Sequence, residues 1–328
     1  DEAGPFPMHE IPTQRDAFIP GCPPDHEQRQ AALADALERR VLVLDGATGT
    51  ALQGVRLTAE DFGGAELEGC NEMLCRTRPD VVSGVHHAYL AADCDVVETN
   101  SFGSTPLVLA EYGLAAEAFD LSRRSAAIAR EVCATYDRPG RTRFVCGSMG
   151  PTTKAISVTG GVTFESLTEH FRVQGLGLMA GGADYLLLET CQDTRNIKAG
   201  LVGLERAFEQ CGWRVPVAVS VTIETTGTML AGQDAEALAV SLLHADLLYV
   251  GLNCATGPEL MRDHLRTLSE ICRTRVACVP NAGLPDEEGR YRETPEQFRQ
   301  VFASFLDAGW LNLVGGCCGT TAGHVAAL

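Results

Sequence analysis

Three cysteines in the C-terminal half of the chain could bind one metal ion together. Cys254 ends an apolar run, whereas Cys317 and Cys318 are adjacent within GGCCG. Three thiolates leave one coordination position of zinc open, which is typical of catalytic rather than structural sites. The flanking glycines allow the backbone to bend so that both neighbouring thiols reach one ion. Two alternatives remain open at this point: ordinary buried cysteines, and the vicinal disulfide of a redox protein.

Two carboxylates, Asp45 and Glu189, also stand at the ends of apolar runs. They could hold an ammonium group or act as an acid–base pair. Asp45 could instead cap the helix that follows it. The sequence GATGT after Asp45 lacks the lysine of a phosphate-binding P-loop, so phosphate binding is not predicted.

The elements that would carry these residues alternate regularly along the chain. Apolar runs predict strands at 41–45, 95–99, 143–148, 184–190, 216–224, 247–253, 275–281 and 311–315. Helical periodicity predicts helices at 79–92, 115–136, 164–180, 194–211, 235–244, 258–272, 295–308 and 321–328. Strands that are apolar throughout are covered on both faces. Eight strands alternating with helices predict an α/β fold of the (β/α)8 TIM barrel type. The alternative is an open doubly wound sheet, and no strong GxGxxG supports its dinucleotide-binding form.

Polar residues and cysteines gather at the C-terminal ends of these predicted strands, where barrel enzymes place their working groups. Asn281 ends the seventh strand, between the two strands that lead to the cysteines. Its amide oxygen is therefore a candidate fourth zinc ligand when no substrate is bound. Asn281 could equally owe its place to the turn that follows it.

Charge and cysteine usage exclude several classes of function. The 328 residues carry a formal net charge of −17, which disfavours nucleic acid and anionic membranes as partners. We expect a cytoplasmic protein: the 13 cysteines are odd in number, as suits a reducing compartment, and the N-terminus has no signal-peptide pattern.

The N-terminal part of the chain differs from the rest. Residues 1–25 contain six prolines, which predict an irregular arm, and 28–40 has helical spacing. The predicted organisation is an arm with a lead-in helix over 1–37, followed by one barrel domain over 38–328.

Seven motifs in order resemble the zinc-dependent homocysteine S-methyltransferase family. They are LDGATGT, DVVETNSF, GSMGPT, LLLETCQD, GLNC, PNAG and VGGCCGTT, and together they span roughly residues 38–328. GCNEML at 69–74 and PTTKAISVTGG at 151–161 are most similar to the homocysteine-binding module of cobalamin-dependent methionine synthases.

The resemblance implies methyl transfer to homocysteine, giving methionine, on a (β/α)8 barrel. It implies that Cys254, Cys317 and Cys318 bind Zn²⁺ as the catalytic ligands, and that homocysteine sulfur takes the fourth position. It also implies a pocket for the amino-acid end of homocysteine, formed by Asp45, Gly46, Thr99, Asn100, Ser148 and Glu189. A carboxylate suits the substrate ammonium, and backbone N–H groups or hydroxyls suit its carboxylate.

The same resemblance implies methylcobalamin as the methyl donor, presented by another module and recharged from methyltetrahydrofolate. Folate- and cobalamin-binding modules of one longer chain are then the expected partners. A stand-alone enzyme that uses betaine or S-methylmethionine is the alternative within the family. Outside it, a vicinal-dithiol redox protein and a non-catalytic zinc-binding module remain open.

Overall fold

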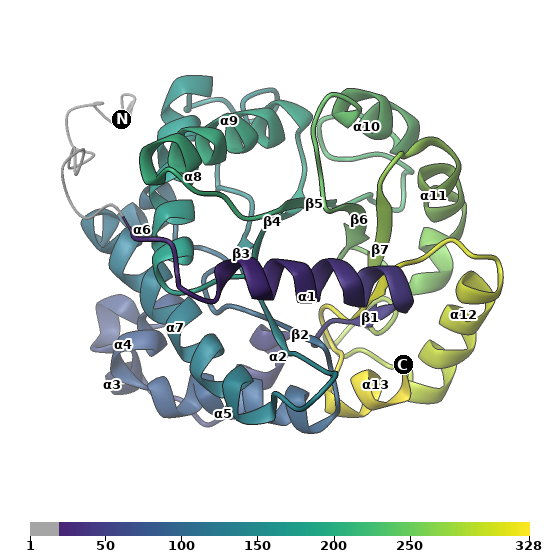
Figure 1. Ribbon diagram of the computed structural model, residues 1–328, viewed down its shortest axis with the longest axis horizontal. Helices are drawn as coiled ribbons and strands as arrows, with labels where there is room; N and C mark the ends of the chain where they lie inside the picture. The colour runs from purple at the N-terminus through teal and green to yellow at the C-terminus, as the bar shows by residue number, and fades with distance from the viewer. Residues whose placement is uncertain (1–19) are drawn as a thin grey trace.

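Eight parallel strands form a ring surrounded by helices (Figure 1). The computed structural model describes residues 20–328, so most of the expected Pro-rich arm lies outside the described residues. The strands are β1 Leu42–Val43, β2 Val96–Glu98, β3 Phe144–Met149, β4 Tyr185–Cys191, β5 Val217–Val221, β6 Tyr249–Asn253, β7 Arg275–Val279 and β8 Leu313–Val314. All eight predicted strands are present, mostly with shorter bounds, and the predicted barrel is confirmed.

The ring closes between the first two strands. The hydrogen-bonded order is β1-β8-β7-β6-β5-β4-β3-β2, and β1 meets β2 through a parallel bridge from Leu44 to Val96. Asp95 N donates to Val43 O at 2.7 Å across the same junction. An open doubly wound sheet would leave two free edges here, so that alternative is excluded.

Helices connect successive strands and cover the outside of the ring. They are α1 His26–Arg39, α2 Thr48–Gln53, α3 Ala59–Phe62, α4 Leu74–Thr77, α5 Pro79–Ala91, α6 Pro106–Leu109, α7 Ala118–Tyr136, α8 Phe164–Ala180, α9 Thr194–Cys211, α10 Ala235–Leu242, α11 Pro258–Ile271, α12 Pro295–Asp307 and α13 Ala322–Ala327. Short 3₁₀ helices span Ala65–Leu67, Asn71–Met73, Ala110–Tyr112 and Ala115–Glu117. Every predicted helix is present, and the short helices between β1 and α5 and after β2 were not predicted.

Local sequence sets the ends of several long helices. Thr163 accepts a hydrogen bond from Ser166 N at the start of α8, and Thr294 accepts one from Gln297 N at the start of α12. Such capping satisfies backbone donors that have no partner inside the helix. Gly212 ends α9 with φ 73°, a left-handed conformation that glycine adopts without steric cost.

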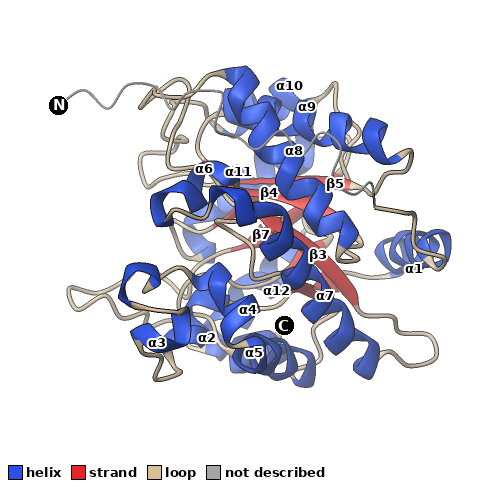
Figure 2. Cartoon of the chain, turned by 90° about the vertical axis from the view of Figure 1, so that its left-hand side faces the viewer, coloured by secondary structure: helices blue, strands red, loops and turns tan. Residues whose placement is uncertain are grey.

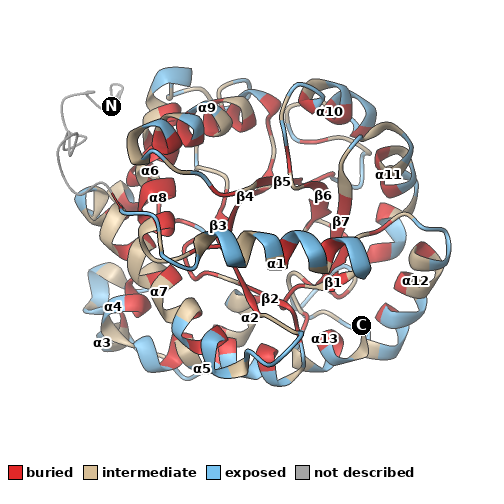
Figure 3. Cartoon of the chain, viewed as in Figure 1, coloured by how far each residue is buried: buried red, intermediate tan, exposed pale blue. Residues whose placement is uncertain are grey.

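Alternate residues of the strands belong to two different apolar clusters. In β4, Tyr185 and Leu187 join the cluster inside the ring, whereas Leu186 and Leu188 join the cluster beneath the helices. Most strand residues are accordingly buried, while the surrounding helices keep exposed outer faces (Figure 3). Successive side chains of a strand point to opposite faces, so Glu189 follows Leu187 on the inner side.

Helix α1 lies across the N-terminal end of the strand ring (Figure 2). Arg29 Nε bonds Asp184 Oδ1 at 2.7 Å, and Arg40 Nη2 bonds Asp95 Oδ1 at 2.8 Å, both at the starts of strands. The ring is thereby closed at this end and available for a site at the other. Among the described helices, none is long and apolar enough to cross a membrane.

Candidate active site

Three thiols converge at the C-terminal end of the ring. The Sγ atoms of Cys254 and Cys318 lie 3.9 Å apart, and those of Cys317 and Cys318 lie 4.0 Å apart. All three lie within 4.8 Å of one another. Among the described residues these three form the one group of His, Cys, Asp or Glu side chains that could hold a metal ion. The adjacent cysteines are free thiols, so the structure has no vicinal disulfide.

The backbone around the thiols is held in conformations that need close packing. Cys254 has φ 62°, which costs a non-glycine residue roughly 1–2 kcal/mol. A Cβ on Gly316 would stand 2.5 Å from Thr320 Oγ1, and one on Gly319 would stand 2.2 Å from Tyr291 Cγ. The glycines beside the cysteine pair are therefore required by close contacts, in addition to the backbone bend expected from the sequence.

The spacing of the sulfurs fits a tetrahedral zinc ion. Zn–S bonds of about 2.3 Å at tetrahedral angles place two sulfurs about 3.8 Å apart, close to the 3.9 and 4.0 Å observed. Hydrogen bonds from Cys254 and Cys317 lower the pKa of the Cys318 thiol to about 3, whereas its hydrogen bonds to the other two thiols raise the pKa of Cys317 well above its usual value. The group thus favours negative charge on at least one sulfur, as a cation ligand requires.

Asn281 follows β7 by two residues and is buried. Its neighbours in the chain, Pro280 and Ala282, are hydrogen-bonded to the backbone of Cys317 and Cys318. Its Oδ1 has no hydrogen-bond partner among the described residues, although buried polar atoms are nearly always paired. Its backbone also forms the expected turn, with Gly283 N donating to Asn281 O at 2.8 Å. The turn accounts for the backbone conformation of Asn281. The unpaired side-chain oxygen is consistent with its predicted role as the fourth zinc ligand.

Three carboxylates gather at the same end of the ring. Asp45 Oδ2 accepts a hydrogen bond from Glu98 N at 3.0 Å, and Glu189 Oε1 accepts one from the Ser148 hydroxyl. Asp45 makes no capping bond, since the N-cap of α2 is Ala47; the capping alternative is wrong. Among the described residues, none of the three carboxylates forms a salt bridge.

Burial without a cationic partner raises the pKa of all three acids. For Glu98, burial acts first and repulsion from Glu189 and Asp45 adds to it. Burial raises the pKa of Asp45 well above its usual range, with repulsion from Glu189 contributing. Burial likewise raises the pKa of Glu189 to about 7, against the Ser148 hydrogen bond. A bound ammonium group would relieve this repulsion and restore the charged forms.

The remaining predicted pocket residues have partners of their own. Thr99 Oγ1 accepts from Ser148 N at 2.9 Å and lies 2.6 Å from Ser101 Oγ. Because Ser101 donates to Ser148 O at 2.8 Å, the Thr99 hydrogen is directed to Ser101. Thr99 thus fixes the backbone at Ser148. Its hydroxyl oxygen can still accept a hydrogen bond from a ligand but has no hydrogen left to donate.

Asn100 and Gly46 flank this pocket differently. Asn100 Nδ2 donates to Asn71 O at 2.7 Å, so its amide is tied to the 3₁₀ helix Asn71–Met73. A Cβ on Gly46 would stand 2.7 Å from Tyr89 Cε1, so only glycine fits there. The substrate contacts assigned to both residues stay predictions.

Sequence reasoning missed three residues of this site. Glu98 completes the acid cluster, Tyr291 covers Gly319, and the buried Asn253 bonds the end of β4. Glu98 lies in the motif DVVETNSF, and its alternation with Val96 on the inner side of the ring could have identified it. Asn253 alternates with Tyr249 on the inner side of β6 in the same way, but its partners on β4 and β5 could not be predicted. Tyr291 lies outside the strands and had no such signal.

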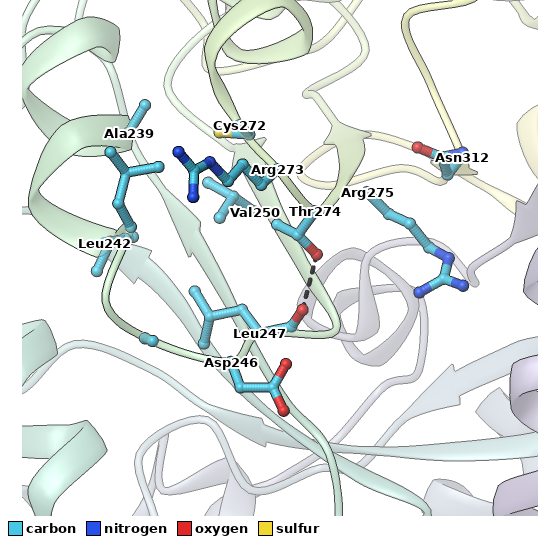
Figure 4. A pocket seen from close by; sticks show the side chains of 12 residues that line it. Ala239, Leu242, Asp246, Leu247, Val250, Cys272, Arg273, Thr274, Arg275 and Asn312 are labelled. Carbon is cyan, nitrogen blue, oxygen red and sulfur yellow. Dashed lines mark hydrogen bonds between the residues drawn. The ribbon is translucent and has the colours of Figure 1, made fainter.

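A cavity of about 600 Å³ lies at the other end of the barrel (Figure 4). Its lining includes Asp246, Arg273 and Arg275, near the starts of β6 and β7, and Thr274 Oγ1 donates to Leu247 O at 2.7 Å there. None of the predicted site residues lines it. Barrel enzymes act at the opposite end, so the size of this cavity does not make it the active site.

Most of the chain matches a known protein family. The profile of the homocysteine S-methyltransferase family matches residues 42–328. The chain is 44% identical over 306 residues to a protein named methionine synthase from Mycobacterium leprae, covering 92% of this chain and 25% of that protein. It is 45% identical over 298 residues to the methionine synthase of Mycobacterium tuberculosis, covering 89% and 25%.

A solved structure shows the same fold. The metallated form of the homocysteine methyltransferase MmuM from Escherichia coli superimposes with a TM-score of 0.73 at 24% identity, covering 92% of this chain and 98% of that chain. The curated relatives are longer: this chain spans about a quarter of their length.

Proposed function

Since this chain belongs to the homocysteine S-methyltransferase family, we propose that it transfers a methyl group to the sulfur of homocysteine, forming methionine. The observation that carries the proposal is the cluster of three thiols beside the buried carboxylates of Asp45 and Glu189 and the half-buried one of Glu98, at one end of the barrel. Thiols suit a zinc ion that binds the substrate sulfur, and the carboxylates suit the substrate ammonium.

Cys254, Cys317 and Cys318 would hold the zinc through their sulfurs. Zinc held there would lower the pKa of the homocysteine thiol and so supply a nucleophilic thiolate at neutral pH. The amide oxygen of Asn281 would occupy the remaining position when no substrate is bound. An amide oxygen is a weaker ligand for zinc than a thiolate, so Asn281 would leave this position available to the homocysteine sulfur.

The carboxylate group would orient the other end of the substrate. Glu189, held by the Ser148 hydroxyl, accepts from the substrate ammonium, and Asp45 supports the same charge. The backbone of Gly46 would donate to the substrate carboxylate. Holding both ends of the substrate would present its sulfur to the methyl donor.

The methyl donor in this proposal is methylcobalamin, recharged from methyltetrahydrofolate. The new S–CH₃ bond forms as the donor's bond to its methyl group breaks, and the donor keeps that electron pair. The relatives that are 44–45% identical are named methionine synthase and are about four times longer than the matched region. Folate- and cobalamin-binding modules of one longer chain would therefore be the partners.

The test is a comparison of donors under reducing conditions. Homocysteine is incubated with the protein and methylcobalamin, betaine or S-methylmethionine in parallel, and methionine is measured. The proposal predicts methionine from methylcobalamin, at a slow rate because a free donor lacks the effective concentration of a tethered one. Methionine formation with betaine or S-methylmethionine alone would change the proposed donor and leave the proposed methyl transfer to homocysteine in place. Bound zinc without methionine from any donor would indicate a non-catalytic zinc-binding module.

A further inference from the structure

Strand β4 contains an irregularity next to Glu189. Leu188 pairs with Val219 of β5 and Cys191 pairs with Val221, so two residues of β4 face the single residue Ser220. Such a bulge inserts one extra residue and redirects side chains, and bulges are common beside active sites. Its extra residue follows Glu189 directly, so the bulge sets how that side chain leaves the strand.

The bulge has a backbone conformation that needs support. Thr190 has φ 55°, in the left-handed region, where a β-branched side chain is strained. Strain of this kind persists only when the surrounding structure holds it in place. The residue that holds it comes from β6, on the far side of β5.

Asn253 supplies this support with both ends of its amide. Its Oδ1 accepts from Thr190 N at 2.9 Å and from the Ser220 hydroxyl at 2.7 Å. Its Nδ2 donates to Thr190 Oγ1 at 2.7 Å. The side chain is buried, so water does not compete for these bonds. One amide thus joins the ends of β4, β5 and β6.

We propose that Asn253 is a positioning residue, whose amide clamps the bulged end of β4 and thereby aims the Glu189 carboxylate at the substrate ammonium. The inference rests on the proposed function. It assigns to Asn253 a role distinct from that of Cys254, its neighbour in the chain. The Asn253 side chain positions the carboxylate that binds the substrate, whereas Cys254 would bind the metal.

The chemistry of the clamp requires an amide. It must accept two hydrogen bonds on one atom and donate one from another, which aspartate, leucine and alanine cannot do. The backbone of Asn253 is fixed independently, because Thr222 Oγ1 donates to Asn253 O at 3.1 Å. Removal of the amide should therefore release β4 without releasing the start of the loop that carries Cys254.

The experiment measures homocysteine affinity by calorimetry and zinc affinity by chelator competition on the same preparations. Asn253→Ala should weaken homocysteine binding at least tenfold and change zinc affinity less than threefold. Asn312→Ala is the matched control: its Oδ1 also accepts from a strand backbone, Val276 N at 3.0 Å, but at the opposite end of the barrel. It should bind homocysteine like the parent.

A second variant keeps the inference testable if Asn253→Ala does not fold. Thr190→Val retains the β-branched shape and removes only the bond from Asn253 Nδ2, so homocysteine affinity should fall three- to tenfold. Thr190→Ser keeps the hydroxyl and should bind within twofold of the parent. In an Asn253→Ala background, Thr190→Val should add nothing, because the bond it removes is already absent.

The outcomes separate the inference from the function on which it rests. A parent protein that binds no homocysteine would overturn both. A parent that binds it, with Asn253→Ala or Thr190→Val binding equally well, would overturn the inference alone. Zinc affinity falling by the same factor as homocysteine affinity would also overturn it, since Asn253 would then be supporting Cys254.

Discussion

The Sγ atoms of Cys254 and Cys318 lie 3.9 Å apart although 64 residues separate them in the chain. The first follows β6 and the second follows β8, with β7 between them. The two thiols meet only when these three strands are paired in register. A metal bound there would therefore bind the folded barrel in preference to the unfolded chain and stabilise it by mass action.

Replacing one thiol should remove the metal while leaving the fold intact. Cys317→Ala leaves two sulfur ligands, too few for a stable zinc site, so zinc content by atomic absorption and methionine formation should be lost together. Circular dichroism should stay that of the parent, because Cys317 is only half-buried at the edge of the cluster inside the ring and alanine removes a single sulfur atom there. Cys211→Ser, a half-buried cysteine at the end of α9, is the control and should keep both. Full zinc content with full turnover in Cys317→Ala would remove it from the site.

Glu189→Gln should weaken homocysteine binding without loss of zinc. The change removes a charge-assisted hydrogen bond to the substrate ammonium, worth about 1.5–3 kcal/mol. That loss corresponds to at least a tenfold weaker affinity in a homocysteine titration. Glu236→Gln, on the exposed first turn of α10, should bind as the parent does. Equal affinities for parent and Glu189→Gln would exclude this carboxylate from substrate binding.

The stability of the substrate-free protein should depend on the protonation of Glu189. Burial raises its pKa from 4.5 to about 7, so the folded protein binds this proton more tightly than the unfolded chain. The stabilisation from this bound proton is fully present below about pH 4.5, the pKa of Glu189 in the unfolded chain, and is lost as the pH rises through about 7. Between pH 4.5 and about 7 the unfolding free energy of the parent should fall, relative to that of Glu189→Gln, by an amount on the order of 1–3 kcal/mol. Urea titrations across this range check it, and parallel pH profiles would contradict it.

Asn281→Ala should change the metal site only before substrate binds. With Co²⁺ in place of zinc, the absorption spectrum of the substrate-free variant should differ from that of the parent, because water must replace the amide oxygen. The homocysteine-bound spectra should coincide, since the substrate sulfur has displaced either ligand. Asn312→Ala provides the control. Identical substrate-free spectra would show that Asn281 forms the turn but does not bind the metal.

Sequence alone predicted the barrel because its signals are local and repeated. Each strand is a short apolar run, and helices such as α8 and α9 follow the 3.6-residue period over 17 and 18 residues. The helices α2 and α3, of six and four residues, are too short to show that period. Their positions depend on loop packing, which the hydrophobic pattern does not encode.

The site residues that stand at the ends of strands could be predicted from the sequence. The hydrogen bonds that join one strand to another could not. Cys254, Cys317 and Glu189 stand at strand ends, and barrel geometry brings such positions together. Asn253 stands at one too, but its role depends on a bulge in β4 that no sequence pattern marked. The hydrogen bonds between Asn253 and the bulge of β4 exist only in the folded ring.

The most direct test of the account is the coordination of zinc before and after homocysteine is added. X-ray absorption at the zinc edge should show three sulfurs and one light atom in the substrate-free protein, and four sulfurs when homocysteine is bound. That change would establish that the substrate sulfur joins the ion held by the three cysteines. An unchanged spectrum, under conditions in which calorimetry shows homocysteine bound, would contradict the account.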